Sequence, residues 1–165
     1  MLMLPDEYLM AAAQAREPDI VVHNINGDYL RRWYVIPRNK EFNIYLHNFV
    51  GDDDDRALHD HPWHSMSLIL KGGYIEHLPS GLQTIRRPGE IIYRLPEDSH
   101  RVALHRDRQG IPLPAWTVFI TGARVREWGF HCPKGWVQWD KFVSANDSGA
   151  VGKGCDAAEQ EVANG

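Results

Sequence analysis

The chain lacks the features that mark several large classes of protein. No window of the sequence is apolar over the roughly 18 residues that a membrane-spanning helix needs. The first residues show no cationic segment followed by an apolar one, which is the pattern of a signal peptide. Positive charge is not in excess, because the formal net charge is −4 at pH 7. We therefore expect neither a nucleic acid nor a membrane as a partner.

Cysteine is also scarce. The sequence contains two cysteines, Cys132 and Cys155, and the second lies in a segment whose composition is typical of disorder. Small domains that depend on disulfides carry several cysteines, and cytosolic proteins keep theirs reduced. We therefore expect no disulfide, a reducing compartment and a cytoplasmic location.

The length and composition are those of one globular domain. The chain has 165 residues, of which 43% are hydrophobic and 24% charged, and these values suit a single core. From Ser144 onward the composition shifts to small and polar residues without periodicity. Such a segment buries too little apolar surface to offset its ordering entropy. We predict one domain over residues 1–143 and a disordered tail over 144–165.

The pattern of apolar runs and turn residues predicts an all-β fold with one short N-terminal helix. The helix is expected over residues 5–16, where it begins at a proline and ends before Pro18. Glycine and proline turns then separate short apolar runs, as in a sandwich or barrel. We expect the barrel core over about residues 32–130. The predicted strands are 32–37, 42–50, 63–71, 73–78, 82–86, 90–95, 100–105, 115–121 and 125–130.

The most informative segment spans residues 58–73 and reads LHDHPWHSMSLILKGG. Residues two apart in an extended strand point to the same side, so His59 and His61 project together. Farther along the chain, the turn at 96–99 delivers His100 onto another strand. Three imidazoles that leave coordination positions open are typical of a reactive metal site. We predict that these three histidines hold one divalent metal ion.

These motifs resemble those of the cupin superfamily. The first cupin motif has a His-x-His pair, then a glutamate ligand and a glycine; here Ser65 stands in the glutamate position and Gly72 in the glycine position. The second motif is matched at His100, whereas Asp98 and Leu104 replace its glycine and asparagine. The resemblance implies a double-stranded β-helix, or jelly-roll, barrel with a metal inside it.

The resemblance also implies a chemistry, because no carboxylate stands among the ligands. A metal bound by three neutral histidines keeps its charge of +2 and favours an anionic substrate. Within the cupins, such a site resembles those of the thiol dioxygenases and related ring- or diketone-cleaving dioxygenases. The sequence around His59 and His61, and Arg101 after His100, are similar to the thiol dioxygenase motifs. This similarity implies Fe(II), with Zn, Ni or Mn as alternatives.

Other positions depart from the thiol dioxygenase pattern. Met66 stands where that family has a cysteine, and Thr117 where it has a tyrosine. We therefore transfer the metal ligands and no other residue role. An arginine that pairs with the substrate is expected, and the candidates are Arg31, Arg32, Arg94 and Arg101. The residues assigned to the pocket around the metal are Ser65, Arg94 and His131.

Several conspicuous residues have simpler interpretations. His64 and Asp60 alternate with the paired histidines, so both should point away from the metal. The run Asp52–Asp55 lacks the spacing of a calcium loop and reads as a solvated loop. The aromatic segment 128–139 is interpreted as core packing at one end of the barrel, with a lid over the mouth as the alternative.

The outer face of the central predicted strand suggests a partner. Met66, Leu68 and Leu70 lie opposite the ligand side, and an apolar outer face needs cover. We therefore expect a homodimer.

Three functions remain open from the sequence. The first is a metal-dependent enzyme, namely a non-haem Fe(II) dioxygenase that acts on a small anionic molecule. The second is a non-catalytic protein that binds or senses a small molecule. The third is a metal-free sugar isomerase or epimerase in which His59 or His100 acts as the base.

Overall fold

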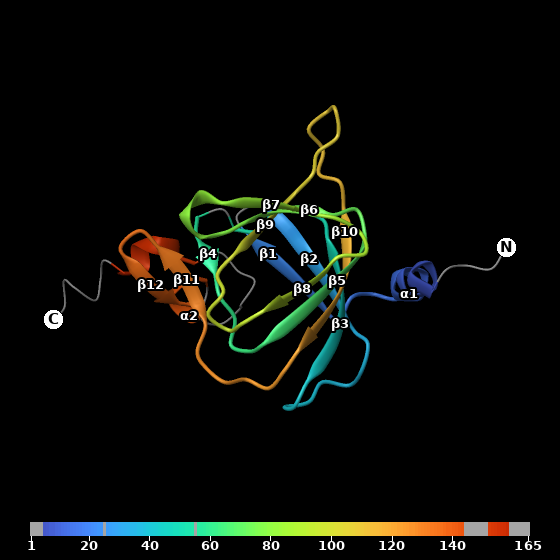
Figure 1. Cartoon of the computed structure of the whole chain (residues 1–165), viewed down its shortest axis with the longest axis horizontal. Helices are drawn as coiled ribbons and strands as arrows, with labels where there is room; N and C mark the ends of the chain where they lie inside the picture. The colour runs from blue at the N-terminus through green and yellow to red at the C-terminus, as the bar shows by residue number, and fades with distance from the viewer. Residues whose placement is uncertain (1–4, 25, 55, 144–151, 159–165) are drawn as a thin grey trace.

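The computed structural model describes residues 5–24, 26–54, 56–143 and 152–158, and within them the fold is almost entirely β (Figure 1). The helices are α1 (Pro5–Gln14) and α2 (Trp139–Phe142), with short 3₁₀ turns η1 (Pro79–Gly81) and η2 (Gly154–Ala158). The strands are β1 (Ile20–Asn24), β2 (Gly27–Tyr34), β3 (Asn43–Phe49), β4 (Leu58–His59), β5 (Ser65–Lys71), β6 (Tyr74–His77), β7 (Gln83–Arg86), β8 (Ile91–Arg94), β9 (Arg101–Leu104), β10 (Ala115–Thr121), β11 (Gly129–Cys132) and β12 (Gly135–Gln138).

The strands form antiparallel sheets that curve around a common interior (Figure 1). The largest sheet has the order β1-β2-β3-β10-β5-β8, and smaller sheets have the orders β7-β6-β9 and β12-β11-β4. Non-consecutive strands are neighbours, as β10 between β3 and β5 shows, which is the connectivity of a jelly roll rather than a meander. The prediction of an all-β barrel with a short N-terminal helix is confirmed.

The differences from the predicted strands lie at the ends of the barrel. The expected strand 32–37 begins earlier, at Gly27, whose positive φ of 109° makes the tight turn from β1. β1, the two-residue β4 and the hairpin β11–β12 were not predicted as such. β4 is too short to show a period, and β11 falls partly outside the predicted strand 125–130.

A steric constraint explains why β5 is followed by a glycine, Gly72. Its φ is +80°, and a Cβ at this position would lie 2.4 Å from the carbonyl oxygen of Pro114. A side chain would therefore push apart the β5–β6 turn and the segment that leads into β10. The structure thus gives a steric reason for the glycine that closes the first histidine motif.

The helix α1 packs on the outside of the large sheet. Met10 and Ala13 are buried against Trp33, Leu46 and Trp116 in one apolar cluster. Leu70, at the end of β5, packs against the same cluster and is therefore partly covered by the chain itself.

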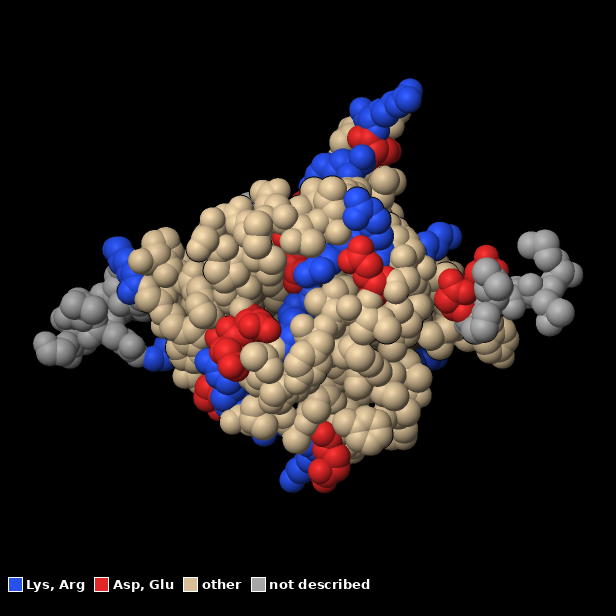
Figure 2. All heavy atoms as spheres, viewed as in Figure 1, with Lys and Arg blue, Asp and Glu red and all other residues tan. Residues whose placement is uncertain are grey.

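The rest of the outer face of β5 is less covered. Met66 and Leu68 point outward, and their neighbours on β8, Ile91 and Tyr93, are 65% and 61% exposed. In Figure 2 the surface over β5 and β3 carries few charged side chains. The homodimer stays a prediction.

The two cysteines contradict the expectation of no disulfide. Cys132 on β11 is bonded to Cys155 in η2. The prediction was wrong because composition does not reveal that η2 returns to β12 and α2. Residues 144–151 and 159–165 of the predicted disordered tail lie outside the described residues, whereas 152–158 include the 3₁₀ turn. With a disulfide present, cysteine usage no longer argues for a reducing compartment, and the cytoplasmic location stays a prediction.

Among the described residues, every helix is too short or too polar to cross a lipid bilayer.

Candidate metal centre

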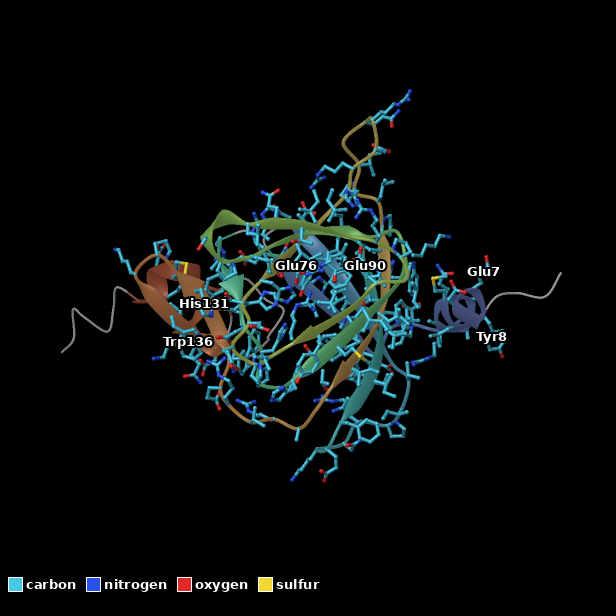
Figure 3. All side chains as sticks on the ribbon, in the orientation of Figure 1. Glu7, Tyr8, Glu76, Glu90, His131 and Trp136 are labelled. Atoms are coloured by element: carbon cyan, nitrogen blue, oxygen red, sulfur yellow. A yellow bond between two sulfur atoms is a disulfide. The ribbon has the colours of Figure 1, made fainter. Side chains whose placement is uncertain are left out.

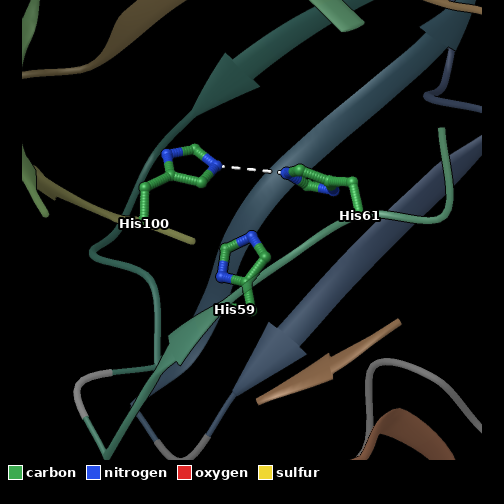
Figure 4. Close-up of side chains that lie close together, drawn as sticks. All are labelled: His59, His61 and His100. Carbon is green, nitrogen blue, oxygen red and sulfur yellow. Dashed lines mark hydrogen bonds between the residues drawn. The ribbon is translucent and has the colours of Figure 1, made fainter. Parts of the chain in front are cut away.

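The imidazoles of His59, His61 and His100 converge inside the barrel (Figure 4). One ring nitrogen from each lies within 4.8 Å of the other two, and the Nε2 atoms of His61 and His100 are 3.1 Å apart. His100 is buried, and the other two are partly buried. The structure therefore brings together the three histidines predicted from the sequence spacing.

The backbone fixes this arrangement. His59 and His100 occupy opposite positions of an antiparallel bridge and exchange backbone hydrogen bonds of 2.9 and 3.0 Å. The amide of His61 donates to the carbonyl of Pro96, which holds the chain extended after β4. The turn before His100 is closed by Asp98, whose carboxylate accepts a 2.8 Å hydrogen bond from the amide of Leu95. Asp98 thereby supports the turn at the position where the cupin motif has a glycine.

Two buried carboxylates lie behind two of the histidines. Asp53 Oδ2 is 3.1 Å from Nδ1 of His59, and Glu76 Oε1 is 2.9 Å from Nδ1 of His100. A carboxylate behind Nδ1 favours the tautomer that carries its proton on that atom. The Nε2 lone pairs of His59 and His100 then point inward, as ligands require.

The Nε2 atoms of His61 and His100 are close enough to bind the same cation. If both Nε2 atoms carry lone pairs, two acceptors face each other at 3.1 Å without a proton between them. A divalent ion resolves this repulsion, since metal–imidazole bonds of about 2.0–2.1 Å allow two nitrogens to approach this closely. The donor set, its burial and the carboxylates behind it therefore fit a metal ion.

Burial and charge shift the protonation of the cluster in different directions. Burial lowers the pKa of His61 well below its ordinary value, and burial together with Arg94 lowers the pKa of His100 to about 4. Burial opposes charge on His59 as well, but the adjacent Asp53 carboxylate outweighs it and raises its pKa. His61 and His100 are therefore held neutral, which is the form that binds metals.

Glu76 is the most deeply buried carboxylate near the site, with 0% of its surface exposed (Figure 3). Arg86 Nε donates to it at 2.7 Å, and Arg94 donates through Nε at 2.9 Å and also through its terminal nitrogen. Burial would raise the pKa of Glu76, but its contacts with His100 and Arg94 hold it below its ordinary range. Glu76 is therefore an anion that links two arginines to His100.

The cluster borders a cavity of about 180 Å³, which continues into an inner cavity of about 60 Å³. His59, His61 and Arg32 line both. Nε of Arg32 donates a 2.8 Å hydrogen bond to Nε2 of His47, and its guanidinium carbon lies 4.7 Å from the centre of the Tyr45 ring. No carboxylate pairs with Arg32 among the described residues. Arg32 is therefore a cation in the cavity without a protein anion.

The other predicted pocket residues have different positions. Arg94 lines the inner cavity but is engaged by Glu76. Ser65 is buried, and its hydroxyl has no hydrogen-bond partner among the described residues. His131 lies on the β11–β12 hairpin, where its Nε2 is 3.0 Å from Asp60 (Figure 3). Neither Ser65 nor His131 lines the cavity that borders the histidines.

The residues predicted to point away from the metal do so. His64 is exposed and its Nδ1 is 2.6 Å from the hydroxyl of Tyr93. Asp60 is buried on the far side of its strand, where it accepts hydrogen bonds from the amide of Gly129 and from Trp136 Nε1. Asp60 therefore anchors the aromatic hairpin.

The interpretation of Asp52–Asp55 as a solvated loop is wrong for its centre. Asp53 and Asp54 are only 5% and 7% exposed, and Asp54 pairs with Arg56. The amide of Asp53 donates to the carbonyl of Val102, so this loop is tied to β9. The roles of Asp53 and Glu76 were missed because both depend on contacts that local sequence patterns do not reveal. The one available signal was that Glu76 has the parity of a barrel-facing residue in β6.

No protein-family model matches the chain, and no curated protein matches its sequence. Solved structures do match its fold. The lyase "DMSP lyase DddQ" from Ruegeria pomeroyi DSS-3 is 13% identical, with a TM-score of 0.50, over 66% of this chain and 54% of the lyase. A cupin-like protein from Thermotoga maritima MSB8 is 11% identical, with a TM-score of 0.50, over 70% of this chain and 85% of that protein. The chain thus spans about half the length of the lyase.

The fold is therefore a double-stranded β-helix barrel with histidines directed into it. This is the cupin fold, and the resemblance noted in the sequence is confirmed at that level. Because one fold hosts many reactions, the choice of activity depends on the residues in the barrel.

Proposed function

We propose that this protein is a metal-dependent cupin enzyme, a non-haem Fe(II) dioxygenase that acts on a small anionic molecule. The observation that carries the proposal is a set of three imidazoles without a carboxylate ligand, next to a cavity that contains the unpaired Arg32. His59, His61 and His100 would hold the ion. Bound iron would supply the activation of O2 that oxidises the substrate.

The charges around the cavity support an anionic substrate. A divalent ion and Arg32 contribute positive charge, whereas Asp53 faces the cavity as a carboxylate. Glu76 adds little negative charge there because Arg86 and Arg94 already pair with it. The cavity therefore keeps an excess of positive charge, and an anionic substrate lowers the cost of burying it.

The residues around the site would each have a separate task. Arg32 binds and orients the acidic group of the substrate, with its own position set by His47 and Tyr45. Asp53 and Glu76 hold two of the histidine rings. The aromatic side chains at the cavity exclude water from the substrate.

The two alternatives receive less support from these contacts. A metal-free sugar isomerase needs a histidine free to exchange a proton with a neutral, hydroxylated substrate. Here the cavity is lined by aromatic rings and an unpaired cation. A binding or sensing protein fits the same cavity, and turnover distinguishes it from an enzyme.

The test uses the untagged full chain. Metal content is measured by mass spectrometry, the protein is reloaded with Fe(II) without oxygen, and oxygen uptake is then screened against small thiol, hydroxy, dicarbonyl and aromatic acids. We expect about one iron per chain and oxygen uptake that requires both an acid and His61. Iron binding with acid binding but no oxygen uptake would favour the sensor. Conversion of a sugar by metal-free protein would favour the isomerase.

A further inference from the structure

The cavity beside the histidines has an aromatic wall. Trp63, Trp128, Phe119 and Phe130 line it together with Arg32. Trp63 stacks on His61 at 6.4 Å between ring centres, and Phe119 is 6.1 Å from His61. Flat apolar faces therefore line the cavity next to His61.

One of these rings also carries a buried donor that makes no hydrogen bond. The indole Nε1 of Trp63 is buried and has no hydrogen-bond partner among the described residues. A buried N–H without an acceptor costs free energy comparable to a lost hydrogen bond. Because Nε1 of Trp63 is enclosed, the group in the cavity that is available to an acidic ligand is the Arg32 guanidinium.

The size of the cavity limits the ligand. It measures about 180 Å³, whereas a dry cavity on the order of 150 Å³ holds one benzene molecule. Pockets for larger organic ligands have volumes of roughly 300–1,000 Å³. One six-membered ring with a small acidic substituent therefore fills the available space.

We infer that the substrate of the proposed dioxygenase is a monocyclic aromatic acid. Its acidic group pairs with Arg32, and its ring lies against Trp63 and the neighbouring aromatic residues. This inference rests on the proposed function for the reaction, but the binding of such an acid is a separate property of the cavity. An aromatic ring gains from the edge-to-face and stacked contacts that this wall offers, whereas a saturated ring of equal size does not.

The probes are benzoate, cyclohexanecarboxylate and benzamide. The second removes the aromatic ring and the third removes the charge, at nearly constant size. Binding is measured by calorimetry on metal-free protein and on protein loaded with Zn(II), so that no turnover is needed. We expect benzoate to bind about two- to tenfold more tightly than cyclohexanecarboxylate and at least about tenfold more tightly than benzamide.

Variants of Arg32 and Trp63 test which side chains are responsible for the affinity for benzoate. Arg32→Met should weaken benzoate at least about tenfold, whereas Arg31→Met removes the same charge from an exposed neighbour on β2 and should not change binding. Trp63→Phe keeps a ring and removes only the N–H, so it should weaken benzoate less than Trp63→Leu. Circular dichroism shows whether each variant is folded. If Arg32→Met does not fold, Arg32→Lys retains the charge and should bind benzoate more weakly.

The outcomes separate this inference from the proposed function. Equal binding of benzoate and cyclohexanecarboxylate would overturn the aromatic assignment, and an Arg32→Met variant that binds benzoate normally would overturn the assignment of the acidic group. Either result leaves metal loading and oxygen uptake untouched. Conversely, selective benzoate binding by a protein that binds no iron would support the cavity assignment and contradict the dioxygenase.

Discussion

The two ends of the barrel interior are built from the same strands but with different side chains. At one end, Ile69, Tyr74 and Leu104 belong to an apolar cluster with Ile92, Val102 and Ala115. At the other end, charged and polar side chains point inward beside the aromatic wall of the cavity. The strand β6 shows the change within two residues, from Tyr74 in the apolar cluster to Glu76 beside His100.

The difference shows that one end of the barrel interior stabilises the fold, whereas the other end contains the candidate metal site. Apolar burial contributes about 25 cal/mol per Å² wherever it occurs, so the packed end stabilises the barrel. Burying Glu76 is unfavourable unless Arg86, Arg94 and His100 compensate its charge. Buried charges of this kind are unfavourable for stability, and they occur at the end of the barrel that contains the three histidines.

The largest effect should follow removal of a ligand. His61→Ala should weaken metal binding more than about 100-fold, beyond the 10–100-fold typical of residues behind a ligand, while the thermal unfolding of the metal-free protein changes little. His64→Ala is the matched control, because His64 is exposed and its ring contacts Tyr93 instead. Metal titration followed by calorimetry measures both, and full occupancy in His61→Ala would contradict the ligand assignment.

The packed end should respond in the opposite way. Ile69 is 1% exposed, and its replacement by alanine should lower the free energy of unfolding by about 2–4 kcal/mol without changing metal affinity. Leu68→Ala, one residue earlier on the outer face, should cost clearly less. Chemical denaturation measures both, and equal losses at the two positions would remove the distinction between inside and outside on β5.

Glu76 contributes both to metal binding and to the stability of the fold, so a change at this position should affect both. Glu76→Gln should weaken metal binding about 10–100-fold and also destabilise the fold, because Arg94 loses its buried anion. Metal affinity is measured on the folded fraction to separate the effects. The control is Glu90→Gln, whose carboxylate lies 3.9 Å from Arg86 and is farther from the ligands. Unchanged affinity in Glu76→Gln would show that His100 needs no carboxylate behind it.

The smallest effect concerns pH and the metal-free protein. Burial, together with Arg32, lowers the pKa of His47, and the pKa values of His61 and His100 are lowered as well. The unfolded chain takes up these protons near pH 6.5, whereas the folded chain binds them only at lower pH, about 4 for His100. Stability should therefore fall as the pH decreases from about 6.5 toward 4.

The raised pKa of His59 acts in the other direction, but it is one histidine against these three, and His77, whose pKa burial also lowers, acts with the three. A loss of roughly 1–2 kcal/mol between pH 7 and 5.5 is expected. Chemical denaturation of the metal-free protein between pH 7 and 5.5 tests this prediction. His47→Gln removes one titrating group and should make the free energy of unfolding less dependent on pH. Stability that is constant or rises on acidification would contradict the assignment.

Much of the barrel was predictable because its strands obey local rules. The burial of residues alternates in β10 from Thr117 to Thr121, and the glycines at 72 and 73 follow β5 where a turn is required. The ligand pair His59 and His61 followed from the same two-residue period. β4 was not predictable, since two residues carry no period and its strand character comes from pairing with β11.

Periodicity and residue spacing were sufficient to predict the all-β architecture and the three histidines, because both patterns act along the chain. The folded chain was needed to show which carboxylates lie behind those histidines, that Arg32 rather than Arg31 lines the cavity, and that Cys132 is bonded to Cys155. The physical reason is that pairing of charges and thiols depends on proximity between strands far apart in sequence. Local patterns carry no information on that proximity.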